Sequence, residues 1–82
     1  MITIYGSMLC PDCVQCRNEL DQAGVQYEYH DFGEDLRSLK TFLKLRDREA
    51  IFAQAKENGS IGIPCIVRED GSVTLDWSEL LM

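Results

Sequence analysis

The sequence predicts one α/β domain spanning residues 1–82, with a four-stranded mixed sheet flanked by helices. Two segments near the N-terminus alternate apolar and polar residues as half-buried strands do, and the segment between them repeats apolar residues every three or four positions, as a helix does. The second half shows helical patterns first and two short apolar strands after them. Strands are expected over residues 1–5, 25–32, 64–67 and 73–75, and helices over residues 11–23, 34–46 and 48–58.

The ends of the first strand and of the first helix are marked by residues that favour such boundaries. Residues 1–5 alternate with β-branched side chains, and Gly6-Ser7 then interrupts the pattern. Pro11 is favoured at the first position of a helix, and Gly24 is placed to end it. The apolar face of this helix consists of Cys13, Cys16, Leu20 and Ala23.

The remaining strands and helices are predicted from the same kinds of residue pattern. The segment 25–32 completes a strand-helix-strand unit, which predicts a right-handed crossover. The segments 34–46 and 48–58 read as two helices, or as one helix broken near Asp47. A turn at Glu69-Asp70-Gly71 joins the last two strands into a hairpin. Residues 77–82 are too few for an independent helix and must dock on the sheet.

Composition narrows the class of protein. The chain has 45% hydrophobic and 27% charged residues, ordinary for a water-soluble domain, and no apolar run long enough to span a membrane. Its net charge of −6 argues against nucleic acid or an anionic membrane as a partner. Since the chain begins directly with a strand and shows no secretory signal, we expect a cytoplasmic protein, and a monomer.

Four cysteines in so short a chain suggest that some of them have a chemical role. In a reducing compartment such thiols are more often catalytic or metal-binding than joined in a structural disulfide framework. Two of them stand in the run Cys10-Pro11-Asp12-Cys13, where they can close a small reversible disulfide. The run therefore predicts thiol–disulfide exchange.

The expected helix start divides the roles between the two thiols. Cys10 directly precedes Pro11, so its sulfur faces the free amides and the positive end of the helix dipole, which favour a thiolate. Cys13 lies one turn in, on the apolar face, and is expected to be buried. We therefore predict Cys10 as the nucleophile and Cys13 as the resolving thiol.

With these features, the chain resembles the glutaredoxins of the thioredoxin-fold superfamily. The resemblance rests on Cys10-Pro11-Asp12-Cys13 after a strand ending Tyr5-Gly6-Ser7, and on Ile61-Gly62-Ile63-Pro64-Cys65 before a hairpin. The latter stretch is similar to that of a bacterial group called glutaredoxin-related proteins. The resemblance implies a thioredoxin/glutaredoxin fold, a cis Pro64 beside Cys10, and an Ile63 backbone free to pair with a substrate. The substrate-binding residues it implies are Pro11, Asp12, Ile63, Pro64 and Asp76.

Three departures from the family pattern concern glutathione. A lysine that usually precedes the first cysteine is replaced by Ser7-Met8-Leu9, and the usual Gly-Gly pair after the hairpin is absent, which leaves Asp76 as the one counterpart. Asp12 replaces an aromatic residue and puts a negative charge beside the nucleophile. The expected substrate is a disulfide-containing protein or glutathione disulfide, and the reductant is glutathione or a flavoprotein reductase. No bound cofactor is expected.

Other interpretations remain open from the sequence. Cys16 and Cys65 are expected mainly as core residues, since free cysteine packs like a small apolar side chain, although either could serve as an accessory thiol. Together with Cys10 and Cys13 they could instead bind zinc or an iron–sulfur cluster. A third hypothesis is a binding module that uses the hairpin edge or Trp77. His30 is expected on the polar side of its strand, without a catalytic role.

Overall fold

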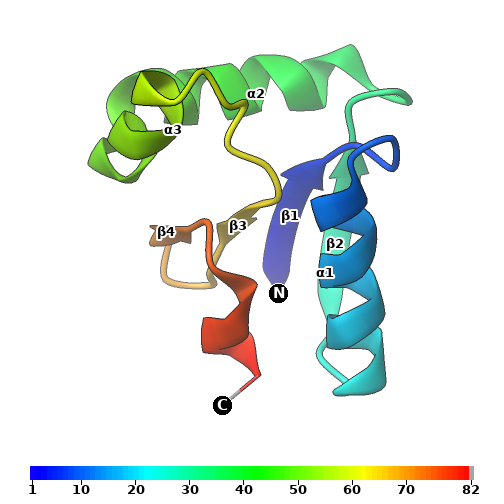
Figure 1. Cartoon of the computed structure of the whole chain (residues 1–82). Coiled ribbons are helices and arrows are strands. Elements are labelled where there is room, and N and C mark those ends of the chain that lie inside the picture. The colour runs from blue at the N-terminus through cyan, green and yellow to red at the C-terminus, as the bar shows by residue number, and fades with distance from the viewer. Residues whose placement is uncertain (82) are drawn as a thin grey trace.

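The computed structural model describes residues 1–81 and confirms the predicted α/β fold with its four-stranded mixed sheet. Its regular elements are β1 (Ile2–Gly6), α1 (Pro11–Gln22), β2 (Tyr27–Asp31), α2 (Leu36–Arg48), η1 (Ala50–Phe52), α3 (Ala53–Glu57), β3 (Cys65–Val67), β4 (Val73–Thr74) and η2 (Trp77–Leu80). The elements η1 and η2 are short 3-10 helices. This succession of elements is shown in Figure 1.

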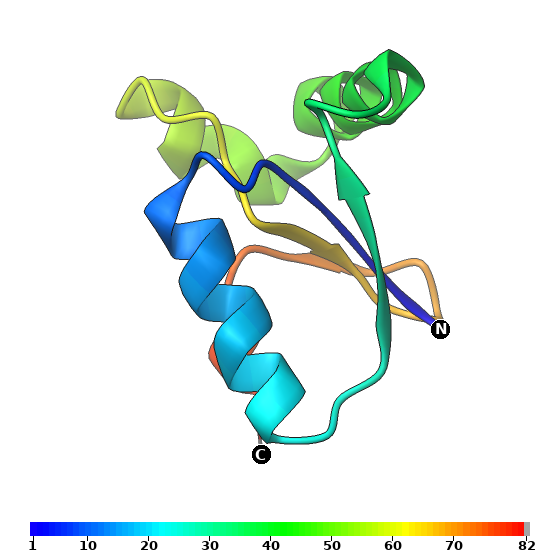
Figure 2. The same cartoon turned by 90° about the vertical axis from the view of Figure 1, so that its right-hand side faces the viewer.

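The strands lie in the order β2-β1-β3-β4. β1 runs parallel to β2 and antiparallel to β3, and β3 is antiparallel to β4, so the sheet is mixed as expected. The helix α1 lies on one side of the strands, while α2 and α3 lie on the other (Figure 2). The carboxyl end of β1, the start of α1 and the start of β3 consequently meet at one end of the sheet (Figure 1).

Two buried clusters hold the layers together, one on each face of the sheet. Their boundary runs through β3, where consecutive side chains of a strand point to opposite faces. Cys65 packs with Phe42 and Phe52 beneath α2 and α3, whereas Ile66 packs with the side chains of α1. The α1 cluster consists of Ile4, Cys16, Leu20 and Ile66. The expected core positions of Cys16 and Cys65 are confirmed, since both are fully buried.

The boundaries of the middle helices differ from those expected. α2 begins two residues later, because the carboxylate of Asp35 accepts a hydrogen bond from the Arg37 N–H at 2.9 Å and caps the helix. The break that was expected near Asp47 falls at Glu49, whose backbone is extended. The segment beyond it starts as a 3-10 turn before α3, so the second helix is shorter than the sequence pattern predicts.

His30 is less exposed than its place in the strand pattern predicts. Its ring lies 5.3 Å from the ring of Tyr5, centroid to centroid, and Nδ1 lies 3.2 Å from the Ser38 hydroxyl. The alternation of polar and apolar residues in β2 suggested a solvent-facing residue, but α2 covers this face of the sheet and leaves the imidazole half-buried.

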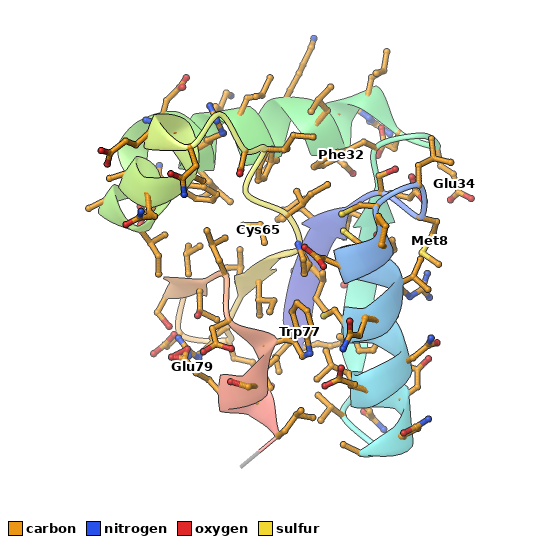
Figure 3. The ribbon with its side chains drawn as sticks, in the orientation of Figure 1. Met8, Phe32, Glu34, Cys65, Trp77 and Glu79 are labelled. Atoms are coloured by element: carbon orange, nitrogen blue, oxygen red, sulfur yellow. The ribbon has the colours of Figure 1, made fainter. Side chains whose placement is uncertain are left out.

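The C-terminal segment docks as predicted, with Met82 outside the described residues. Trp77 and Leu80 pack against the α1 cluster, and the Trp77 indole donates a hydrogen bond to a Glu19 carboxylate oxygen at 3.2 Å. Figure 3 shows Trp77 between η2 and α1. The indole is therefore an anchor for this short segment, which removes Trp77 from the binding-module hypothesis and leaves it the hairpin edge. No helix in residues 1–81 has the length and apolar character of a bilayer-spanning segment.

Candidate active site

Cys10 occupies the position predicted from Pro11, at the N-cap of α1. Its backbone is extended, its N–H donates to the Ser7 carbonyl at 3.0 Å, and its own carbonyl accepts from the Val14 N–H at 3.1 Å. The thiol makes no capping hydrogen bond, and the residue is partly exposed. It stands at the end of the helix that favours negative charge.

Cys13 lies one turn further along and is fully buried. The pKa of its thiol is raised to about 11, mainly by burial and in part by the neighbouring Cys10, while a backbone hydrogen bond from Ser7 opposes the rise. The two thiols thus differ in exposure in the direction that the sequence predicts. An incoming disulfide can reach Cys10 but not Cys13.

A glycine makes room for the buried thiol. Gly6 ends β1, and a Cβ built on it would lie 2.7 Å from the Cys13 sulfur and 2.8 Å from the Tyr29 hydroxyl oxygen. Real Cβ atoms essentially never come so close to other heavy atoms. The residue that appears in the sequence as a simple strand breaker therefore also provides the space in which the Cys13 thiol and the Tyr29 hydroxyl meet.

The segment before β3 is held at the same end of the sheet. Tyr5 pairs with Cys65, which brings the residues that follow β1 and those that precede β3 side by side (Figures 1 and 2). The Ile63–Pro64 peptide bond is cis, as the resemblance implied, and Pro64 is buried. This register brings the loop that leads to Cys10 and the segment before Pro64 to the same end of the sheet, and the substrate contacts of Pro11, Asp12, Ile63 and Pro64 stay a prediction.

Two contacts fix the course of this segment. Arg46 of α2 donates to the carbonyl oxygens of Ser60, at 2.7 Å, and Ile61, at 2.8 Å. Gly62 has a φ of +94°, and a Cβ there would lie 2.8 Å from the Phe52 ring. Only glycine combines this backbone conformation with so close an approach. The segment is therefore held from α2 on one side and from η1 on the other.

Asp76 hydrogen-bonds to residues close to it in sequence. Its carboxylate accepts hydrogen bonds from the Ser78 N–H at 3.0 Å and the Ser78 hydroxyl at 2.6 Å, so it caps η2. These bonds lower its pKa. Its suggested contact with substrate stays a prediction, because a carboxylate used in this way has fewer free acceptor sites for a ligand.

The loop before the nucleophile is apolar at its tip. Leu9 is 95% exposed and Met8 is 43% exposed. The loop is nevertheless anchored, since the Met8 N–H donates to Asp31 at 3.4 Å and the Arg17 guanidinium donates to the Met8 sulfur, also at 3.4 Å. Figure 3 shows Met8 beside the first turn of α1. The site therefore presents apolar side chains where the family pattern has a cation.

The four cysteines are free, but they do not converge. Cys16 and Cys65 lie in the two clusters on opposite faces of the sheet, and burial raises the pKa of each thiol to about 12. Within residues 1–81 there is no group of three or more histidine, cysteine, aspartate or glutamate side chains placed to hold a metal. The structure gives the metal hypothesis no support. An accessory role for Cys16 or Cys65 is not supported either, because both residues are fully buried.

Sequence reasoning missed Tyr29. The alternation in the second strand puts it on the apolar side of the strand, but the pattern carries no information about where the hydroxyl lies. That position follows from the parallel register of β1 and β2, in which Gly6 pairs with Asp31. The Arg17 guanidinium lies 4.3 Å above the Tyr29 ring and holds its outer side. The sequence did contain one indication, because a tyrosine on the buried side of a strand usually needs a hydrogen-bond partner for its hydroxyl.

Comparison with known proteins gives two matches. The model of the glutaredoxin family matches residues 2–71. An uncharacterized protein of Haemophilus influenzae is 42% identical over 77 residues, which cover 94% of this chain and 90% of that protein. No solved structure matches significantly.

Proposed function

Because this chain belongs to the glutaredoxin family, a family of thiol oxidoreductases, we propose that it reduces disulfides by a dithiol mechanism at Cys10 and Cys13. The observation that carries the proposal is the unequal exposure of the two thiols at one helix start. Cys10 is partly exposed at the N-cap, and Cys13 is fully buried one turn later. Such a pair separates the thiol that meets the substrate from the thiol that releases it.

The reaction has two exchanges. The Cys10 thiolate attacks one sulfur of the substrate disulfide, a bond forms between them, and the other substrate sulfur leaves with the electron pair and takes a proton from water. Cys13 then loses its proton to water and attacks the Cys10 sulfur. The Cys10–substrate bond breaks, and the substrate sulfur leaves as the second thiol. The enzyme gains the disulfide that the substrate loses.

The surroundings of Cys10 favour a protein disulfide as substrate. Leu9 and Met8 offer an apolar surface, while Asp12 adds a negative charge that opposes an anionic tripeptide. A polypeptide can cover these apolar side chains and pair with the Ile63 backbone. Glutathione or a flavoprotein reductase then restores the dithiol, and the cytoplasm provides such reductants.

Redox titration read by intact mass tests the proposal. The protein is equilibrated in a glutathione redox series, quenched in acid and alkylated, beside the variants Cys10→Ser and Cys13→Ser. We expect a loss of two hydrogens that requires both Cys10 and Cys13, while Cys16 and Cys65 stay reduced. If no disulfide forms at any ratio, the dithiol mechanism is wrong.

The same titration addresses the substrate. A glutathione adduct trapped on Cys13→Ser would show that glutathione can react at Cys10 despite Asp12 and the missing cation. A Cys10–Cys13 disulfide without a trapped adduct supports a protein disulfide. Turnover of a protein disulfide and of a glutathione-mixed disulfide, compared at equal concentration, then ranks the two substrates.

A further inference from the structure

The hydroxyl of Tyr29 is buried and forms no hydrogen bond of good geometry, although the Cys13 thiol lies close enough to influence its pKa. It is the one such side-chain atom found in residues 1–81. Buried hydroxyls are nearly always paired, so an unpaired one calls for an explanation. Its position suggests one, because both this oxygen and the Cys13 sulfur lie within 2.8 Å of the point where a Gly6 Cβ would stand.

The neighbouring tyrosine shows the contrast. The Tyr27 hydroxyl, on the same face of β2, donates to Asp21 at 2.7 Å and accepts from Arg17 at 3.3 Å. Arg17 meets Tyr29 differently, over the ring face at 4.3 Å, and so leaves the hydroxyl of Tyr29 free. The polar tip of Tyr29 is thereby directed into the site, with the Cys13 thiol beside it.

We propose that Tyr29 is a positioning residue for the second exchange, where its hydroxyl donates a hydrogen bond to the Cys13 sulfur as that sulfur becomes a thiolate. This inference rests on the proposed function, since it concerns the resolving role of Cys13. A thiolate is a far better acceptor than a thiol. The hydroxyl, which has no hydrogen bond of good geometry in the dithiol form, thus gains a full hydrogen bond when Cys13 becomes charged.

The electrostatics of the site agree with this direction. Burial, followed by the proximity of Cys13, raises the pKa of Tyr29, so the phenol keeps its proton and acts as a donor. Hydrogen bonding from the Tyr29 hydroxyl in turn lowers the pKa of Cys13 slightly, against the larger effect of burial. The proton of Cys13 passes to water and not to Tyr29, and the phenol is unchanged at the end of the exchange.

A chromogenic disulfide separates the two exchanges. Rapid mixing of the reduced protein with one equivalent of dipyridyl disulfide releases one thiopyridone when Cys10 attacks and a second when Cys13 resolves. Each phase is followed over a range of pH for the wild type, Tyr29→Phe and the matched control Tyr27→Phe. Intact mass verifies that the product is the Cys10–Cys13 disulfide.

We expect Tyr29→Phe to leave the first release unchanged and to slow the second by about tenfold at neutral pH, with its pH profile displaced upward by about one unit, the effect of one lost hydrogen bond to a charged group. Tyr27→Phe should leave both phases unchanged. The inference is overturned if the second release in Tyr29→Phe keeps the rate and pH profile of the wild type. If the first release itself fails in the wild type, the proposed function is wrong instead.

A second replacement separates hydrogen bonding from packing. With 3-fluorotyrosine at position 29 the ring keeps its shape and its hydroxyl becomes a stronger donor, so the second release should become faster at neutral pH. An unchanged or slower second release would overturn the inference. Thermal unfolding of the reduced variants shows whether they are folded, and Tyr29→Phe should be at least as stable as the wild type, because it removes an unpaired buried hydroxyl.

Discussion

Raising the pH should unfold this protein well before its backbone is damaged, because three of its thiols are buried. Burial raises the pKa of Cys13 to about 11 and those of Cys16 and Cys65 to about 12, against an ordinary value of 9.0. A thiol that binds its proton more tightly when folded stabilises the fold at low and neutral pH. This stability is complete below pH 9.0 and is lost as the pH rises toward the folded values.

The size of the effect follows from proton linkage. Above the unfolded pKa, each buried thiol lowers the free energy of unfolding by roughly 1.4 kcal/mol per pH unit. Three thiols together remove about 4 kcal/mol by one unit above that value. Because small domains have only about 5–15 kcal/mol in total, such a loss is a large part of the stability.

Urea denaturation at constant ionic strength, with reductant present, measures this dependence. The free energy of unfolding should be nearly constant from neutral pH to about one unit below the ordinary thiol pKa of 9.0, and it should fall steeply above that pKa. Cys16→Ala and Cys65→Ala are the informative variants. Each leaves a cavity that lowers the whole curve, but each should also reduce the slope in the first unit above pH 9.0 by about a third, since one of three thiols is removed and the buried tyrosines titrate only above this range.

A free energy of unfolding that stays flat for a full unit above the thiol value would refute this reasoning. So would an unchanged slope in both alanine variants. Either result would mean that the buried sulfurs reach solvent or a cation when they ionise, and that the two clusters are looser than the structure shows.

Three further outcomes are expected. The second thiopyridone release should accelerate about tenfold per pH unit from neutral pH upward, because the pKa of Cys13 is raised to about 11; a plateau near neutral pH in stopped-flow measurements would contradict this. Gly62→Ala should lower stability by about 1–3 kcal/mol in urea denaturation, since the new Cβ meets the Phe52 ring at 2.8 Å with φ at +94°. Arg46→Met should speed amide hydrogen exchange around Ile61 by removing the 2.8 Å hydrogen bond to its carbonyl, with little change in α1; equal exchange in both proteins would show that the segment needs no such support.

The sequence predicted the elements and the unequal exposure of Cys10 and Cys13 because these depend on local rules. Pro11 at a helix start and Cys13 on the apolar face determine the exposure of the thiols without any knowledge of the tertiary fold. The cis bond before Pro64 was different, because only the family resemblance implied it. Periodicity cannot reveal the isomer of a peptide bond.

Properties that depend on the register between strands could not be predicted. The meeting of Tyr29 with Cys13 requires the parallel pairing of β1 and β2 and the absence of a side chain at Gly6. The half-burial of His30 likewise requires α2 to cross that face of the sheet. These are contacts between segments whose relative placement no local pattern encodes, and a shift of one residue would reverse the side chains of a strand.

The strand order β2-β1-β3-β4 contains two pairs of strands that are close in sequence, joined by one pairing between strands that are far apart in sequence. β1 and β2 are joined through one helix, and β3 and β4 through one tight turn, so each pair can assemble early at a small cost in chain entropy. Pairing of β1 with β3 joins nearly opposite ends of the sequence. We therefore expect two early-folding halves, whose joining between β1 and β3 limits the folding rate and, in the same event, brings the Pro64 segment up to the cysteine motif.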